Sequence, residues 1–158
     1  MTRRTHNTTK LVWGLIVAIL VVLIGGYLFC THRVANAVPG HVYQYTSVNG
    51  NNKLYMTFSK DTDRVVVTTD KAQALKAHNS DSDFEDVYKS EAKNGTWQYL
   101  AKESHLTLSK TQSGQNSRWQ YNRVLVLGRK MYAGSFTYQI ANAGQGIDRK
   151  NTTFQRVK

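Results

Sequence analysis

The feature that most constrains this chain is an apolar run near its amino terminus. Leu11 to Phe29 contains no charged residue, and the ten residues before it carry Arg3, Arg4 and Lys10 without an acid. At about 1.5 Å of rise per residue, a helix over this run measures about 28 Å, close to the roughly 30 Å hydrocarbon core of a bilayer. The sequence therefore predicts a transmembrane anchor over residues 11–29. Residues 1–10 are expected to form a cytoplasmic tail, because basic residues favour that side.

Two other interpretations of the same run stay open. The triplet at 35–37, Ala-Asn-Ala, matches the small-x-small pattern of signal peptidases, and cleavage after Ala37 would release a secreted protein that begins at Val38. Cys30 follows the run directly, as the cysteine of a lipoprotein would, although the residues just before it are large. The run exceeds the usual signal core of about 7 to 15 residues, and Arg33 stands before the cleavage site. An uncleaved anchor is therefore the favoured interpretation.

Residues 30–39 are expected to form a linker, and residues 40–158 a single β domain on the far side of the membrane. That domain is large enough for one hydrophobic core. The chain has 41% hydrophobic and 20% charged residues, which is ordinary for a globular protein. One cysteine and one proline exclude a disulfide scaffold and a cysteine-ligated zinc site.

Alternation of apolar and polar residues predicts strands through most of the domain. The expected strands are 41–48, 53–58, 64–69, 97–101, 104–110, 118–127 with a bend near Asn122, 131–140 and 152–157. Asn49-Gly50 indicates a hairpin turn between the first two. Asp70 can cap one short helix over 71–78, and residues 142–145 are expected to be a loop.

The segment 84–92 is ambiguous in sequence. Ser82 and Glu85 fit a capping box, which favours a helix, whereas Asn94-Gly95 just downstream is a strong hairpin signal. A strand is the favoured interpretation, preceded by a loop over 79–83. Eight or nine short strands at this spacing predict an all-β fold, a small antiparallel barrel or closed sandwich with one short helix.

Aromatic residues at alternate strand positions are numerous enough to fill the interior of such a barrel. They are first of all candidates for the core. The alternative is that some line a cavity for a small apolar or amphipathic ligand. The cavity candidates are Tyr43, Tyr45, Trp97, Tyr99, Trp119 and Tyr138.

The layout of basic tail, single apolar span, short linker and tyrosine-rich β domain without disulfides resembles small surface proteins and lipoproteins of lactobacilli and related Gram-positive bacteria. Some of those are similar to lipocalin-like, calycin-type barrels. Gly95-Thr96-Trp97 resembles the Gly-x-Trp motif of lipocalins, although here it follows about half of the domain. The resemblance implies a surface location and no assigned activity.

Charge is distributed unevenly along the part that follows the anchor. Residues 31–103 carry nine bases and nine acids, whereas residues 104–158 carry nine bases against Asp148 alone. A basic face near a membrane attracts anionic lipid headgroups or cell-wall polymers. The predicted contact residues are Arg118, Arg123, Arg129, Lys130, Arg149 and Lys150. Arg129 and Lys130 are expected at a hairpin tip, and the alternative is that all these residues are scattered, solvated positions.

Other chemistry has little support in the sequence. The acidic residues of 81–86 lack the glycine that an EF-hand loop needs, and the histidines lack metal-ligand spacing. No nucleophile motif of a hydrolase or transpeptidase is present. We therefore expect a monomeric, non-enzymatic surface protein without cofactor or metal. Nucleic acid is not the expected partner, although the pI is about 9.9, because the basic domain lies outside the cell.

Overall fold

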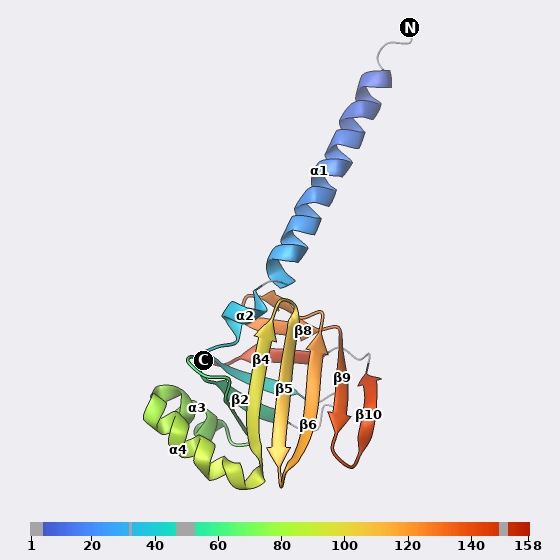
Figure 1. The fold of residues 1–158 in the computed structure, drawn as a ribbon. Coiled ribbons are helices and arrows are strands. Elements are labelled where there is room, and N and C mark those ends of the chain that lie inside the picture. The colour runs from blue at the N-terminus through green and yellow to red at the C-terminus, as the bar shows by residue number, and fades with distance from the viewer. Residues whose placement is uncertain (1–4, 32, 47–52, 149–151) are drawn as a thin grey trace.

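The computed structural model describes residues 5–31, 33–46, 53–148 and 152–158. It contains one long helix followed by a β-rich domain (Figure 1). The helices are α1 (Thr5–Thr31), α2 (Val34–Ala37), α3 (Lys71–Asn79), α4 (Asp81–Glu91) and the 3-10 helix η1 (Ala92–Asn94). The strands are β1 (Val42–Thr46), β2 (Lys53–Phe58), β3 (Val65–Thr68), β4 (Thr96–Lys102), β5 (His105–Gln112), β6 (Gln115–Asn122), β7 (Leu125–Leu127), β8 (Lys130–Ala133), β9 (Ser135–Ile140), β10 (Gly144–Asp148) and β11 (Thr152–Arg156).

The predicted apolar anchor is a single continuous helix, α1. Its segment Lys10–Cys30 is long and apolar enough to cross a membrane, with a mean hydropathy of 2.7 and none of its residues buried against the domain. Figure 1 shows α1 projecting away from the β domain. Among the described residues, no part of the domain buries these apolar side chains, so α1 is compatible with a membrane span by its length and composition.

The segment 30–39 differs from the linker that the sequence suggested. α2 follows α1 closely, and Val34 and Val38 are fully buried in the main core. The Tyr43 hydroxyl donates a hydrogen bond of 2.8 Å to the carbonyl oxygen of Ala37. The residues around the candidate cleavage site are therefore part of the folded domain. The sequence does not indicate this, because their burial depends on contacts with residues far away in the chain.

The strands form two antiparallel sheets, which confirms the predicted β class. Sheet A has the order β3-β2-β1-β11-β8-β7, and sheet B has the order β10-β9-β6-β5-β4. In Figure 1 the strands of sheet B run lengthwise in front of those of sheet A, which cross behind them. The strand count exceeds the predicted eight or nine. The Asn49-Gly50 turn lies outside the described residues, but β1 and β2 pair as antiparallel neighbours on either side of it.

Two expected strands are each divided between the sheets. The segment 118–127 leaves sheet B at Arg123, whose φ is 51°, and continues as β7 in sheet A. The segment 131–140 returns at Gly134 from β8 in sheet A to β9 in sheet B. β6 and β9 pair directly in sheet B, so the β7–β8 hairpin that connects them in sequence is an insertion that joins sheet A. The segment 142–145, expected to be a loop, enters β10 at Gly144.

The core lies between the sheets. Inward residues of sheet A meet those of sheet B, as in the contact of Phe154 with Tyr121, whose ring centroids are 4.9 Å apart with an angle of 87°. Alternate positions of each strand face this layer, as expected for a sheet with one buried face. The main core cluster contains Val34, Val38, Tyr43, Tyr45, Met56, Phe58, Val65, Leu106, Leu108, Tyr121, Val124, Val126, Met131, Ala133 and Phe154.

The prediction of a strand over 84–92 is wrong, because residues 84–91 belong to α4 and Ala92 begins η1, and the loop expected over 79–83 is reduced to the single residue between α3 and α4. Ser80 rather than Ser82 caps the helix, and its hydroxyl oxygen accepts a hydrogen bond of 3.1 Å from the Asp83 amide. Phe84 and Val87 lie on one side of α4 and are buried against sheet A. This spacing suits a helix and not a strand. The domain thus has two substantial helices instead of one, and the capped helix predicted at 71–78 is confirmed as α3.

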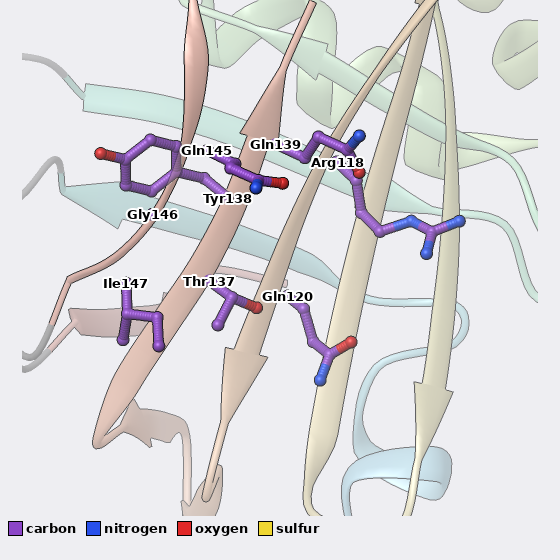
Figure 2. Close-up of a pocket in the computed structure, with 8 residues that line it drawn as sticks. All are labelled: Arg118, Gln120, Thr137, Tyr138, Gln139, Gln145, Gly146 and Ile147. Atoms are coloured by element: carbon purple, nitrogen blue, oxygen red, sulfur yellow. The ribbon is translucent and has the colours of Figure 1, made fainter.

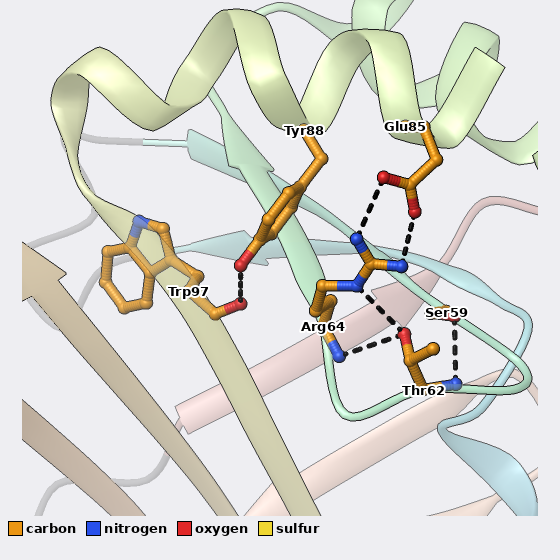
Figure 3. Close-up of polar contacts among 6 residues, drawn as sticks. All are labelled: Ser59, Thr62, Arg64, Glu85, Tyr88 and Trp97. Atoms are coloured by element: carbon orange, nitrogen blue, oxygen red, sulfur yellow. Dashed lines mark hydrogen bonds and ion pairs between the residues drawn. The ribbon is translucent and has the colours of Figure 1, made fainter. Parts of the chain in front are cut away.

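A polar cluster attaches α4 to the sheets (Figure 3). The Arg64 guanidinium, just before β3, forms an ion pair with Glu85 and lies 5.3 Å from the centre of the Tyr88 ring. The Tyr88 hydroxyl donates a hydrogen bond of 3.2 Å to the carbonyl oxygen of Trp97 on β4. Arg64 and Gln98 also form an isolated antiparallel bridge. These contacts bring the β3 edge of sheet A close to the β4 edge of sheet B.

Candidate functional site

Over β6, β9 and β10, the outer face of sheet B carries polar side chains in cross-strand rows, all of them uncharged except Arg118. Arg118, Gln139 and Gln145 lie opposite one another on β6, β9 and β10. The next row pairs Gln120 with Thr137 on β6 and β9. Figure 2 shows these side chains on three neighbouring strands around a common hollow. This face therefore offers amide, hydroxyl and guanidinium groups to a single surface.

Three adjoining hollows continue this surface around the end of sheet B. The first, of about 510 Å³, lies over the two polar rows. The second, of about 330 Å³, lies at the β9–β10 turn and shares Gln139 and Gln145 with the first. The third, of about 400 Å³, lies on the opposite side of the sheet end and shares Ile140 and Ala141 with the second. Neighbouring hollows share lining residues, so they follow one another around the end of sheet B, from its outer face to its core-facing side.

We call this feature the distal groove, because the β5–β6 and β9–β10 turns beside it lie at the end of sheet B farthest from α1 (Figure 1). Its lining is dominated by amide and hydroxyl side chains. The distal groove is lined by Lys110, Gln112, Ser113, Gln115, Asn116, Ser117, Arg118, Trp119, Gln120, Thr137, Tyr138, Gln139, Ile140, Ala141, Asn142, Gly144, Gln145, Gly146 and Ile147.

The charge of the distal groove is positive. No aspartate, glutamate, histidine or cysteine occurs among these lining residues, whereas Arg118 and Lys110 each contribute a cation. Within the described part of the chain, the exposed Arg118 guanidinium has neither an ion pair nor a hydrogen bond. The Lys110 ammonium lies 5.7 Å from the centre of the Trp97 ring. Neither cation is neutralised by a carboxylate, so both can attract an anion.

An aromatic pair stands at the inner end of the distal groove. The rings of Trp97 and Trp119 stack with centroids 5.2 Å apart and an interplanar angle of 30°. Both side chains are half-buried, and Trp119 lines the groove. The Tyr88 hydrogen bond to the Trp97 carbonyl ties this strand to α4 (Figure 3). The pair therefore offers a rigid apolar surface beside polar groups, an arrangement typical of small-molecule and glycan sites.

Hydrogen bonds between the two distal turns fix the shape of the groove. The Asn142 amide nitrogen donates to the Gln115 side-chain oxygen at 2.7 Å, and the Ala141 backbone amide donates to the Ser117 hydroxyl at 2.9 Å. On β10, a Cβ at Gly146 would lie 2.7 Å from the Tyr138 hydroxyl oxygen. Glycine at this position lets the Tyr138 ring lie over β10.

The structure divides the predicted basic residues instead of gathering them on one face. Arg118 lies in the distal groove, five residues before Arg123, which corresponds to about 16 Å along a strand. Arg123 lies at the opposite end of sheet B, between β6 and β7. Arg129 lies in the β7–β8 turn and Lys130 begins β8, so the hairpin-tip prediction is confirmed. Arg149 and Lys150 lie outside the described residues.

The predicted cavity aromatics occupy two environments. Tyr43 and Tyr45 are buried in the main core, and burial raises the pKa of both phenols, so both stay neutral. Tyr99 is half-buried and donates a hydrogen bond of 2.7 Å to the Ser59 carbonyl. Trp119 and Tyr138 are cross-strand partners at the edge of the core and both line the distal groove. Five of the six candidates thus belong to the core or pack against it, and Trp119 and Tyr138 line the groove.

Sequence reasoning missed the amide and hydroxyl residues of the groove. Gln139 and Gln145 carry no charge and match no motif, so nothing in the linear sequence singles them out. Their signal is positional, because they occupy the polar positions of strands whose apolar positions face the core. Recognising that they meet Arg118 requires the register of β6, β9 and β10.

Comparison of the chain with protein-family models, with curated proteins and with solved structures finds no significant match.

Proposed function

We propose that this chain is a single-pass membrane protein without enzymatic activity, whose β domain binds an anionic, hydroxyl-rich polymer of the cell envelope in the distal groove. The observation that carries the proposal is the lining of the groove, in which amides and hydroxyls accompany one cation on each face of sheet B and no carboxylate. Amides and hydroxyls can exchange hydrogen bonds with sugar or polyol hydroxyls, and the cations select a polymer that carries acidic groups.

The shape of the groove supports a polymer as ligand. From Thr137 to Ala141 along β9 and its turn, the lining extends about 13 Å at about 3.3 Å per residue, before it continues to Trp119. A path of this length suits a chain molecule better than a compact metabolite. The stacked tryptophans add an apolar surface on which a sugar ring can lie.

The anchor supports the proposed location. Basic residues precede the span, so the positive-inside rule favours a cytoplasmic amino terminus and an extracellular β domain. The burial of Val34 and Val38 favours an uncleaved anchor over secretion after Ala37. With α1 in the membrane, the β5–β6 and β9–β10 turns beside the distal groove lie at the end of sheet B farthest from the bilayer (Figure 1).

The proposal also includes the closure of the sandwich, the cell-surface location and the oligomeric state of the domain. The Arg64–Gln98 bridge, with the Tyr99 amide donating to the Asp63 carbonyl at 2.6 Å, favours a barrel-like closure at one corner of the sandwich. We propose a cell-surface location like that of the small surface proteins of lactobacilli whose layout the chain resembles. We also propose that the domain acts as a monomer.

Binding of soluble polymers to the full chain in nanodiscs of zwitterionic lipid tests the proposed function. Polygalacturonate serves as the anionic hydroxyl-rich probe and dextran as the neutral one. Trp119 lies in the groove, so its emission reports occupancy, and Trp13→Phe removes the tryptophan of the anchor. We expect polygalacturonate to bind at low salt, more weakly at high salt, and more tightly than dextran.

A matched pair of substitutions locates the contact. Arg118→Gln removes the cation of the groove, and we expect about fivefold weaker binding, since one cation near an anionic surface contributes about 1 kcal/mol. Arg123→Gln removes the same charge at the other end of the domain and should leave binding within twofold, as a roughly estimated margin. Absence of binding by the wild-type chain, or equal losses in both variants, would refute a groove centred on Arg118.

A further inference from the structure

A second surface, independent of the distal groove, lies where the domain meets the anchor. β7 is the edge strand of sheet A and contacts both α1 and α2. Figure 1 shows β8, the partner of β7, beside α2 at the foot of α1. The β7–β8 hairpin is therefore the part of sheet A closest to the membrane end of the domain.

The connection to α1 fixes the depth of this hairpin. The apolar span ends at Cys30, and the Arg33 guanidinium lies 5.1 Å from the centre of the Phe29 ring. A bilayer of about 40–45 Å with a hydrocarbon core of about 30 Å leaves about 5–7 Å of headgroups on each side. Because α1 contacts β7 directly, the hairpin lies at the level of these headgroups when α1 spans the bilayer.

The outward side chains of the hairpin combine apolar and basic groups. Val126 and Met131 are buried in the core, so by alternation their strand neighbours point away from it. Leu127 is 48% exposed and Tyr132 is 36% exposed, which leaves an apolar patch open to the surroundings of the domain. Lys130, opposite Leu127 in the register, is exposed beside this patch.

Other cations lie at the same end of the molecule. Arg123 precedes β7 and is exposed, and the Arg129 guanidinium in the β7–β8 turn donates a hydrogen bond of 3.3 Å to the Val157 carbonyl. The acid at this end is Glu103, in the β4–β5 turn, which the Val124–Ser104 backbone hydrogen bond holds next to β7. With Arg33 and Lys130, four cations thus oppose one carboxylate among the described residues of these turns.

We propose that this surface, formed by the β7–β8 hairpin with Arg33 and Arg123, docks on anionic phospholipid headgroups and fixes the orientation of the domain on the membrane. Aliphatic and tyrosine side chains beside lysine and arginine are the combination that membrane interfaces favour, because the apolar parts enter the acyl boundary while the cations meet phosphate. The docked surface leaves the distal groove pointing away from the lipid.

Environment-sensitive labelling of the full chain in lipid vesicles tests the docking. Leu127→Cys in a Cys30→Ser background receives a fluorescent label at the hairpin, and Ser113→Cys in the same background receives it at the distal end. Vesicles contain either phosphatidylcholine alone or an equal mixture with phosphatidylglycerol, and a spin-labelled headgroup lipid quenches nearby labels. The test contains no polymer, so its outcome is separate from that of the groove experiment.

We expect the label at 127 to shift to shorter emission wavelengths and to be quenched by the spin-labelled lipid in phosphatidylglycerol vesicles at low salt. The quenching should fall at least twofold, as a rough expectation, at high salt or when Arg123, Arg129 and Lys130 are all changed to Gln. The label at 113 should stay aqueous and unquenched in every vesicle.

Lys130→Gln alone provides a second variant if the triple variant fails to fold, because Lys130 lies on the surface and a partial loss of quenching is expected from it. A label at 127 that stays aqueous on phosphatidylglycerol vesicles overturns the docking proposal. Quenching that is the same in phosphatidylcholine, or unaffected by Lys130→Gln and by salt, overturns the role of anionic lipid.

Discussion

Val34 provides a direct test of whether the segment after the anchor belongs to the domain. The side chain is fully buried in the main core, although it lies within the segment 30–39 that was expected to be a linker. Val34→Ala removes two buried methyl groups, and the lost burial with the cavity left behind should lower the free energy of unfolding by about 2–3 kcal/mol. For a domain of this size, that corresponds to a decrease in Tm of about 8–12 °C.

The assay is urea and thermal unfolding in detergent of the full chain carrying Trp13→Phe, followed by the emission of Trp97 and Trp119 in the core-facing rows of sheet B. Ala35→Ser, at an exposed position of the same helix, is the matched control and should change the free energy of unfolding by less than about 0.5 kcal/mol. Tyr43→Phe, which removes the hydrogen bond to the Ala37 carbonyl, should cost about 1 kcal/mol.

Equal stabilities of Val34→Ala, Ala35→Ser and the wild-type chain would refute the packing of α2. The same reasoning applies to processing in cells. Cleavage after Ala37 would remove Val34 from the core, so we expect the mature protein to keep its anchor. Intact mass measurement checks this expectation, and a released product that begins at Val38 would contradict it.

Three further predictions concern α3, α4 and the start of β4. The hydrogen bond from Arg64 lowers the pKa of Glu85, so this pair stabilises the fold above the unfolded pKa of about 4.3 and its contribution should be lost as the pH falls. The free energy of unfolding of Glu85→Gln, measured against pH in the acid range, should therefore decrease less than that of the wild-type chain. Burial is the main reason that the pKa of His78 is lowered, so the stability contributed by its neutral form should decrease as the pH falls below about 6.5. In denaturation experiments across this range, the free energy of unfolding of His78→Gln should depend less on pH than that of the wild-type chain. Gly95→Ala should destabilise the domain by more than about 1 kcal/mol, measured by thermal unfolding, because φ is 105° and the added Cβ would lie 2.6 Å from the Lys110 side chain.

Much of the fold follows from local sequence signals. Alternation predicted β2 over 53–58 with its observed bounds, and Asp70 marked the start of α3 by a side-chain oxygen that accepts from the Ala72 amide at 2.7 Å. The apolar run predicted α1. In each case the deciding interactions involve residues close in sequence.

The errors arise where distant contacts decide the structure. The segment 84–92 contains residues compatible with both a strand and a helix, and the burial of Phe84 and Val87 against Val66 selects the helix. The divisions at Arg123 and Gly134 depend on which sheet each half joins. The basic residues can be counted in the sequence. Their separation between the distal groove and the β7–β8 hairpin, however, depends on the change of sheet at Arg123 and Gly134.

The position of β11 in the middle of sheet A has a consequence for biosynthesis. The strand pairs with β1 on one side and β8 on the other, although it is the last strand of the chain. At about 5–20 residues per second, the roughly one hundred residues between β1 and β11 take about 5–20 s to synthesise. During that interval β1 has an unpaired edge, which makes the nascent domain vulnerable to misassociation with other chains. A chain that is clipped just before Thr152 would keep its anchor and all five strands of sheet B, yet its sheet A would remain in two separate parts.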